Sequence, residues 1–395
     1  MTSVTAPART NRDRAFHFVV LLGIVSLFAD MTYEGGRSIT GPYLAVLGAS
    51  ATVVGIVAGG GELLGYALRL VSGRASDTLR RYWAFTIAGY VIQMAAVPAL
   101  ALAGSWQLAA FLIVLERVGK AIRNPAANAM LAQASSEIGR GWGFGLHEAL
   151  DQLGAFVGPL VVAAVLAVRG DYALAFAVLL IPAVLTLATV AAARIIYPSP
   201  QDLATKPADV QTGGLPRVFW LYLAGAALVA AGFADFSLMA FHFERTAIVE
   251  ATLIPIFYAT AQGVSGVGSL ILGRLFDRVG IGVLIPLTLG AALFAPLTFF
   301  GGPVLAFFGV VLWGVGMGVH ESIMAAAVAA MVPSGRIASA YGLFNLGYGV
   351  AWFAGSAAMG FLYDASIPTL VAVSIVLEAA SIPLFLRVRG LSKQA

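Results

Sequence analysis

Long apolar runs alternate with short polar stretches along the whole chain. Each run holds about 20 or more mostly apolar residues, the length that crosses a bilayer as a helix. Backbone polar groups find no water in the membrane core, so such runs form helices or closed barrels. Barrel strands need only about 10 residues and alternate in polarity, which these runs do not. The pattern predicts twelve transmembrane helices, at residues 15–44, 52–73, 82–103, 106–131, 143–168, 172–196, 217–243, 253–275, 281–300, 303–331, 337–362 and 368–387.

The polar positions between the runs repeat in the second half of the chain. Gly73-Arg74-Ala75-Ser76-Asp77 recurs as Gly273-Arg274-Leu275-Phe276-Asp277, and Phe28-Ala29-Asp30 recurs as Phe233-Ala234-Asp235. Internal repeats of this kind are typical of transporters whose site lies between the two copies. We therefore expect an all-α membrane protein with two pseudo-symmetric six-helix bundles. The bundles span residues 1–196 and 217–395, and a polar linker at 197–216 joins them.

Composition and charge support this class. Of the 395 residues, 60% are hydrophobic and 11% are charged, too apolar for a soluble protein. The sequence has no cysteine, which excludes disulfides and thiolate metal sites. Lys and Arg gather at the N-terminus, in the loops after even-numbered spans, in the linker and in the tail, which predicts cytoplasmic termini. We attribute the net charge of +4 to the basic residues that set the membrane topology, and not to nucleic-acid binding. We expect a multi-pass protein of a bacterial inner membrane, with its first helix retained.

Charged residues within the runs fall mainly in the first, fourth, seventh and tenth. Ionisable groups are costly in a bilayer, so they face protein or a wet cavity. These four helices should line a central cavity, while the third, sixth, ninth and twelfth face lipid. The twelfth carries only Glu378. Most aromatic residues are interpreted as lipid-facing. The expected substrate-cavity residues are Arg37, Glu62, Arg117, Lys120, Arg123, His320 and Glu321.

Three carboxylates are candidates for proton coupling: Asp30, Glu34 and Asp235. Asp30 lies deep in the first helix and has its repeat in Asp235. A carboxylate that moves between an apolar setting and a cationic partner takes up and releases a proton. The alternative for Glu34 is a static salt bridge with Arg37, three residues further along the same helix.

Depth matching along helical hairpins predicts ion pairs. In the fourth and fifth helices, Lys120 lies level with Asp151 and Arg123 level with Glu148, giving two stacked rungs. The rungs either staple the hairpin or rearrange with protonation or substrate. In the first hairpin, Arg37 lies level with Glu62 and Asp30 level with Arg69.

The loop between the second and third runs resembles that of the major facilitator superfamily, which reads Gly-x-x-x-Asp-Arg-x-Gly-Arg-Arg. Gly73, Asp77, Arg80 and Arg81 match, although Thr78 replaces a basic residue. The second copy keeps Gly273, Asp277, Arg278 and Gly280. The resemblance implies a conformational latch that holds the cytoplasmic ends of the two halves together. Its residues are Gly73, Arg74, Asp77, Arg81, Gly273, Asp277 and Arg278.

The fifth run resembles the signature of that family's proton-driven exporters. Gly145, Gly154, Gly158 and Pro159 fit its spacing, but Val162-Ala163 stands in place of the closing Gly-Gly. The resemblance implies a hinge in the fifth helix, and ordinary close packing is the alternative. The family's arginine of the fourth helix looks like Arg117, with Ala121 where a glycine is expected.

These features favour a secondary transporter that works by alternating access. We expect proton-coupled export of a small organic or amphipathic solute, including drugs, by a monomer without cofactor or metal. The closest alternative is an uptake symporter or facilitator for an anionic metabolite, because the cluster Arg37, Arg117, Lys120 and Arg123 suits a carboxylate or phosphate. A non-transporting receptor is a third hypothesis. We expect no enzyme, since the sequence lacks the common metalloprotease, phosphate-loop and nucleophile-elbow motifs.

Overall fold

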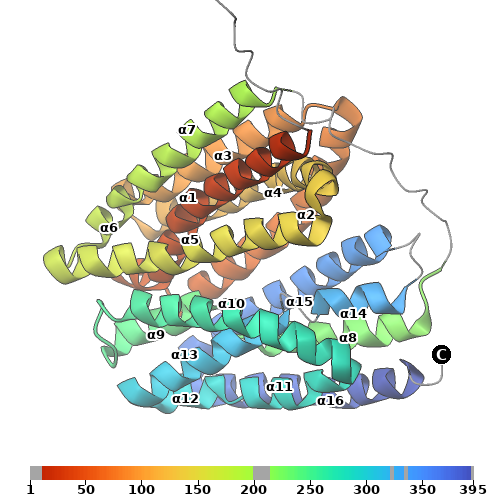
Figure 1. Ribbon diagram of the computed structural model, residues 1–395. Helices are drawn as coiled ribbons and strands as arrows, with labels where there is room; N and C mark the ends of the chain where they lie inside the picture. The colour runs from red at the N-terminus through yellow and green to blue at the C-terminus, as the bar shows by residue number, and fades with distance from the viewer. Residues whose placement is uncertain (1–10, 199–213, 321–323, 333–336, 393–395) are drawn as a thin grey trace, which may run out of the picture.

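The computed structural model describes residues 11–198, 214–320, 324–332 and 337–392 (Figure 1). Within these ranges each predicted span is helical. The first half contains α1 (Asn11–Val46), α2 (Ala51–Leu79), α3 (Tyr82–Ala99) with η1 (Leu100–Leu102), α4 (Trp106–Ile138), α5 (Arg140–Arg169), and α6 (Tyr172–Val178) followed by α7 (Leu180–Ile196). By length and composition, nine helical stretches of the described chain could cross a membrane.

The second half repeats this order with more interruptions. It contains α8 (Arg217–Gly232) with α9 (Phe236–Thr246), α10 (Ile254–Val279), and η3 (Gly280–Val283) with α11 (Leu284–Ala291) and α12 (Phe294–Phe300). It continues with α13 (Pro303–Gly318), α14 (Met324–Met331), α15 (Ile337–Ala365) and α16 (Ile367–Ser392). In Figure 1 the helices of the first half lie together above those of the second half. We call the side where α1 begins and α16 ends the linker side, and the other the opposite side.

The break between α8 and α9 interrupts the seventh span at mid-depth. Asp235 caps α9, because its carboxylate accepts a 2.9 Å hydrogen bond from the backbone N–H of Ser237. The indole N–H of Trp313 donates to the carbonyl of Ala234 at 2.9 Å. Backbone groups freed by a broken helix need such partners within a membrane protein. The break therefore places Asp235 at the interface between the halves, and these two hydrogen bonds satisfy backbone groups beside it.

Small residues bring helices into close contact, both within and between the halves. The carbonyls of Leu27 and Met31 on α1 lie where Cβ atoms on Gly154 and Gly158 of α5 would stand. Between the halves, the carbonyl of Ser356 on α15 does the same at Gly55 of α2. Small residues are the usual means by which membrane helices approach one another.

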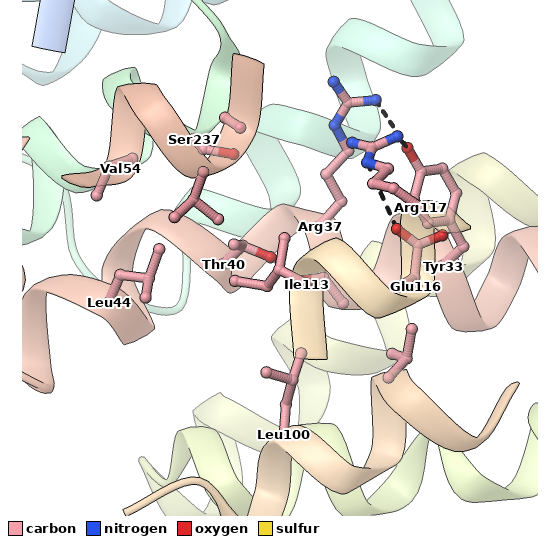
Figure 2. Close-up of a pocket in the computed structure, with 14 residues that line it drawn as sticks. Tyr33, Arg37, Thr40, Leu44, Val54, Leu100, Ile113, Glu116, Arg117 and Ser237 are labelled. Carbon is pink, nitrogen blue, oxygen red and sulfur yellow. Dashed lines mark hydrogen bonds and ion pairs between the residues drawn. The ribbon is translucent and has the colours of Figure 1, made fainter. Parts of the chain in front are cut away.

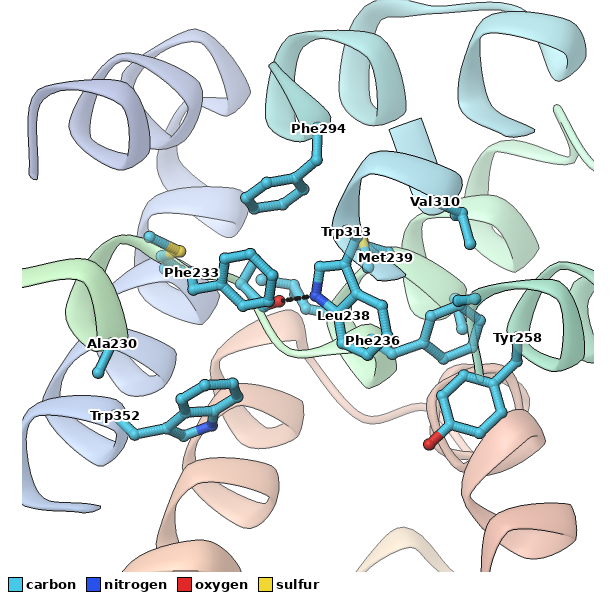
Figure 3. Close-up of a cluster of buried hydrophobic side chains, with 14 of the residues drawn as sticks. Ala230, Phe233, Phe236, Leu238, Met239, Tyr258, Phe294, Val310, Trp313 and Trp352 are labelled. Carbon is cyan, nitrogen blue, oxygen red and sulfur yellow. Dashed lines mark hydrogen bonds between the residues drawn. The ribbon is translucent and has the colours of Figure 1, made fainter. Parts of the chain in front are cut away.

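The core of the second half is aromatic, which corrects the expectation that most aromatic side chains face lipid. Phe233, Phe236, Tyr258 and Trp313 are at most 1% exposed and Trp352 is 5% exposed. They pack around the α8–α9 break, with the ring centroids of Phe236 and Tyr258 4.4 Å apart (Figure 3). The apolar surface is instead supplied largely by aliphatic side chains, as on α7 at Leu180, Ile181 and Val184.

Candidate functional site

A cavity of about 260 Å³ lies between the two halves. The first half lines it with Tyr33, Glu34, Arg37, Glu62, Tyr66, Arg69, Arg117 and Lys120, and the second half with Met317, His320, Tyr348 and Trp352. The first, fourth and tenth spans contribute as expected. The second span, α2, contributes the expected Glu62, whereas no described residue of the seventh span lines the cavity. The eleventh span, α15, contributes Tyr348 and Trp352, which the charge rhythm did not indicate.

Arg37 is the centre of the ion-pair network. Its guanidinium lies 3.1 Å from the carboxylate of Asp235, in the other half, and 3.5 Å from that of Glu62. It also donates a 3.1 Å hydrogen bond to the hydroxyl of Tyr33. The structure thus brings together the depth-matched pair Arg37 and Glu62, and adds a contact between the repeats.

Arg117 shares two partners of Arg37: it lies 2.9 Å from Glu62, and it donates to the hydroxyl of Tyr33. It also lies 3.5 Å from Glu116. Figure 2 shows Arg117 together with Tyr33 and Glu116. Buried charges in a membrane protein are retained when they are paired in this way. Two arginines and three carboxylates therefore form a compact network of paired charges around one tyrosine.

The predicted rungs between α4 and α5 are not formed in this structure. Arg123 turns toward α3, where it donates to Gln93 at 2.7 Å and to the hydroxyl of Tyr90 at 3.1 Å. Lys120 places its ammonium 3.9 Å from the ring centroid of Tyr33. The expected acceptors have other partners: Asp151 accepts from Ser26, and Glu148 from Gln152 at 3.1 Å. Depth matching was wrong here because α1 packs along α5, so level residues do not face each other.

The three candidate proton-coupling carboxylates have different surroundings. Asp30 is 5% exposed, and the charged groups that act on it most strongly are Asp151, Lys120, Glu34 and Arg123. Arg69, its depth-matched candidate, instead lies over the ring of Tyr66 at 5.2 Å. Asp235 is held by Arg37. Of the three, only Asp235 has an ion pair within the described chain.

Glu34 contacts the other half rather than its own helix. It accepts a 2.5 Å hydrogen bond from the hydroxyl of Tyr258 on α10. The static Glu34–Arg37 salt bridge is absent among the described residues, since Arg37 is turned toward Asp235 and Glu62. Glu34 and Arg37 therefore form two polar bridges between the halves, side by side on α1.

Arg37 separates the cavity from a second, smaller void. That void holds about 30 Å³ and is lined by Thr40, Leu44, Val54, Leu100 and Ile113 together with Tyr33 and Arg37 (Figure 2). These residues lie toward the opposite side of α1 and α2. The large cavity continues from Glu62 to Arg69 along α2, toward the linker side. The Arg37 network is thus the division between two unequal compartments.

The halves are bound together on the opposite side. The carboxylate of Asp364, at the end of α15, accepts from the backbone N–H groups of Ala51 and Thr52 at the start of α2, at 3.3 and 2.9 Å. It also lies 3.4 Å from Arg245. Asp364 lies beyond the predicted span 337–362. Burial alone would raise its pKa, but the hydrogen bonds from Thr52 and Ala51 and the nearby Arg245 guanidinium outweigh this, so the pKa lies below its ordinary value.

The predicted latch residues lie at the linker side. Asp77 is exposed, and the partner found for it in the described chain is Tyr82 of its own half, at 3.0 Å. Arg74, Arg81 and Arg278 are also exposed. The side chain of Asp277, and Glu321 as a whole, lie outside the described residues. Gly145 and Gly273 have open space where a Cβ would stand. The expected latch is not engaged by Asp77 in this conformation.

The fifth-helix pattern forms a packing face in this structure. α5 is continuous from Arg140 to Arg169, with Pro159 inside it. Gly154 and Gly158 lie against the backbone of α1, whereas Gly145 does not touch a neighbour. The close-packing alternative thus accounts for the two central glycines, and the hinge stays a prediction.

Sequence reasoning missed several polar members of the site. Tyr33 lies one helical turn before Arg37, and that spacing could have indicated it. Tyr258 and Tyr348 sit in apolar helices that carry no neighbouring charge, so no local signal marked them. Gln93 bridges Arg123 and Glu116, at 2.7 Å from each. It was overlooked because an uncharged amide does not stand out among the charges.

Two bundles of six helices around a charged cavity define a membrane transporter. The chain belongs to the Major Facilitator Superfamily, whose family model matches residues 22–388. The uncharacterized protein Rv2265 of Mycobacterium tuberculosis is 42% identical over 382 residues, covering 95% of this chain and 93% of that protein. The crystal structure of peptide transporter POT in complex with sulfate matches with a TM-score of 0.76 at 14% identity, covering 98% and 99% of the two chains.

A second solved structure is similar in fold. It is a bacterial homolog to the human lysosomal transporter Spinster, in an inward-facing and occupied conformation. Its TM-score is 0.72 at 16% identity, covering 98% of this chain and 97% of that one. At these identities the likeness concerns the fold alone.

Proposed function

We propose that this protein is a proton-coupled transporter that exports a small organic anion by alternating access. The observation that carries the proposal is the cavity itself. Four cationic side chains line it, Arg37, Arg69, Arg117 and Lys120, against two carboxylates, Glu34 and Glu62. Its volume of about 260 Å³ is slightly below the usual range for ligand pockets, about 300–1,000 Å³, which favours a small solute.

Two of the four cations are available to a ligand. Arg37 and Arg117 are held by Glu62, Asp235 and Glu116. For Arg69 and Lys120, the described residues supply no carboxylate within 4.0 Å. Each instead lies over a tyrosine ring, Tyr66 and Tyr33 respectively. An ammonium and a guanidinium together suit a carboxylate or phosphate group.

The remainder of the cavity supports an amphipathic substrate. Met317, Tyr348 and Trp352 of the second half face the cations of the first half across the cavity. A methionine and two aromatic rings offer apolar contact to an aliphatic or aromatic body. The anionic group would then be bound by the first half and the apolar part by the second.

The two unequal compartments support alternating access. The structure is joined at the opposite side through Asp364, and the cavity of about 260 Å³ extends from the Arg37 network along α2 toward the linker side. The distribution of Lys and Arg assigns the linker side to the cytoplasm, so this conformation would receive substrate from inside the cell. Direction rests on the exporter-like pattern of the fifth helix, and coupling rests on Asp30. Uptake of an anionic metabolite is the alternative, which the same cationic cavity also suits.

A ligand-stabilisation screen tests the substrate class. Small carboxylates and phosphates with aliphatic or aromatic bodies are compared with their uncharged amides and esters and with amines. A ligand that binds the folded protein raises its apparent melting temperature. We expect stabilisation by anions only. Lys120→Gln and Arg69→Gln should each weaken it, while Arg14→Gln, at an exposed position at the start of α1, should not.

Two results would contradict the proposal. Stabilisation by amines or uncharged analogues as strong as that by the anions would remove the anionic substrate class. Equal anion binding by Lys120→Gln, Arg69→Gln and Arg14→Gln would remove these two residues from the site.

A further inference from the structure

A second acidic group of the membrane region lies outside the network of Arg37. Glu378, on α16, is 0% exposed. Neither of its carboxyl oxygens has a hydrogen-bond partner within the described chain. The nearby hydroxyls are already engaged, since Ser374 donates to the carbonyl of Gly232 and Ser381 to the backbone carbonyl of Glu378 itself, both at 2.7 Å. An ionised carboxylate without a partner is unfavourable in such a place, so the group is held as the neutral acid.

A small void connects this group with a histidine. The void holds about 10 Å³, close to the least room that one water molecule needs. Glu378 lines it from α16 and Thr288 from α11. Val229 of α8 and Phe233, which directly follows α8, line it as well. His320, just after α13, also lines it. Because His320 lines the central cavity as well, one imidazole borders both spaces.

The surroundings of Glu378 offer no competing charge. Of the elements packed against α16, η3, α11 and α12 contain no charged residue. α8 has only Arg217 and α15 only Asp364, each at a helix end far from the void. His320 is therefore the titratable side chain that shares the void with Glu378. Its Nδ1 forms a 3.0 Å hydrogen bond with the hydroxyl of Tyr348, which leaves Nε2 for proton exchange.

We propose that Glu378 is a proton-binding site of the second half, and that it exchanges its proton with the central cavity through His320. The carboxylic acid gives its proton to the imidazole, directly or through one water, leaving a carboxylate and an imidazolium. The imidazolium then releases a proton to water in the cavity. One proton moves from Glu378 to the cavity, and the histidine returns to its neutral form.

The site adjoins the break between α8 and α9. A Cβ on Gly232, the last residue of α8, would lie 3.0 Å from the Cγ of Glu378. Asp235, three residues later, binds Arg37 of the first half. A change of charge at Glu378 therefore occurs beside the segment that joins the halves. Its role in driving transport rests on the proton coupling proposed above, whereas the proton site itself does not.

Infrared difference spectroscopy on the purified protein tests the proton site without any transport assay. The wild type should show the C=O band of a buried carboxylic acid at neutral pH. Glu378→Gln, which keeps the shape, should lose this band, and Glu137→Gln, at an exposed position on α4, should keep it. In His320→Asn the band should persist, but its hydrogen–deuterium exchange should slow by about 100-fold, the lower range for a positioned proton-transfer group.

Each outcome is decisive. A spectrum that is identical in the wild type and Glu378→Gln would overturn the proton site. An exchange rate unchanged in His320→Asn would overturn the route through His320. If both effects appear but substrate flux ignores a pH gradient, the proton site stands, and the proposed proton-coupled transport fails separately.

Discussion

Arg37 binds a carboxylate from each half of the molecule. Its partners Glu62 and Asp235 come from α2 and from the start of α9, and the side chain of Arg37 is 12% exposed. Breaking such a buried pair at one end leaves an uncompensated charge, which is more harmful than removing both ends. Arg37 therefore joins the two halves by a buried ion pair.

A double-mutant cycle tests the contact between Arg37 and Asp235. Asp235→Asn should lower the apparent melting temperature, with a loss of up to about 3–5 kcal/mol because Arg37 loses a buried partner. Arg37→Gln with Asp235→Asn should recover part of it, giving a coupling energy of about 0.5–3 kcal/mol. The two single losses should be measured under the same detergent conditions. Strict additivity would show that the ion pair has no energetic role.

At this scale the sequence predicted which residues matter better than it predicted their partners. Depth along a hairpin sets the height of a side chain but not the direction in which it points. Arg37 and Glu62 happen to be both level and facing, whereas Lys120 and Asp151 are level and separated by α1. Tyr258, which donates to Glu34 from the other half, could not be found because pairing across the repeats leaves no trace in local spacing.

The helices were predictable as elements because bilayer thickness sets their length. Predicted starts and ends fall within a few residues of those observed in most spans, and α4 extends to Ile138 where its run was expected to end at 131. The break between α8 and α9 was not predicted, because Phe233 and Ala234 continue the apolar pattern. Two of its hydrogen-bond partners, Trp313 and Ser374, are 79 and 142 residues away in the chain.

Alanine substitutions at the glycines of α5 distinguish a role in helix packing from a role as a hinge. Gly154→Ala and Gly158→Ala should each destabilise the protein by at least about 1–3 kcal/mol, because the new methyl group meets the backbone of α1. Gly145→Ala is the matched control. It meets open space, so it should be neutral or stabilising by about 0.5–1 kcal/mol. Thermal stability and transport should be measured together. Loss of transport in Gly145→Ala at unchanged stability would favour the hinge.

The contact between Asp364 and the start of α2 joins the halves on the opposite side. Asp364→Asn removes the charge that binds two N–H groups of α2 and Arg245. We expect closure to weaken by about 1 kcal/mol, or roughly five-fold in population. A probe Thr40→Cys, in the small void beneath this contact, should react faster with a thiol reagent. The sequence has no native cysteine, so this labelling is specific. Unchanged reactivity would exclude the contact between Asp364 and α2 as a gate.

The contact between Asp364 and α2 predicts a pH range over which its effect on closure of the opposite side should stay constant. The pKa of Asp364 is lowered when the opposite side is closed. Closure therefore gains stability above the ordinary pKa of the group and loses it only as pH falls through the lowered value. Between about pH 8 and pH 5 Asp364 stays ionised. Reactivity of Thr40→Cys, corrected for thiol ionisation, should differ between Asp364→Asn and the parent by a constant factor over this range.

At the scale of the whole molecule, weakening the linker side and weakening the opposite side should change the separation of the halves in opposite directions. Spin labels at Phe144→Cys and Leu275→Cys, both exposed on the linker side, report the separation of the halves there. Asp77→Asn should shift their distances toward greater separation, because it removes the predicted latch. Asp364→Asn should shift them toward closure. A shift of the same sign in both variants would contradict a two-state alternating mechanism.

The central claim is tested most directly by substrate flux in proteoliposomes with an imposed pH gradient. An anion identified by the stabilisation screen should accumulate against its gradient when protons flow the other way through the wild-type protein. Asp30→Asn should abolish this accumulation but retain exchange of substrate for substrate, because the cavity cations are intact. Accumulation when protons flow in the same direction would replace export with uptake. Flux that is indifferent to the pH gradient in the wild type would contradict proton-coupled transport altogether.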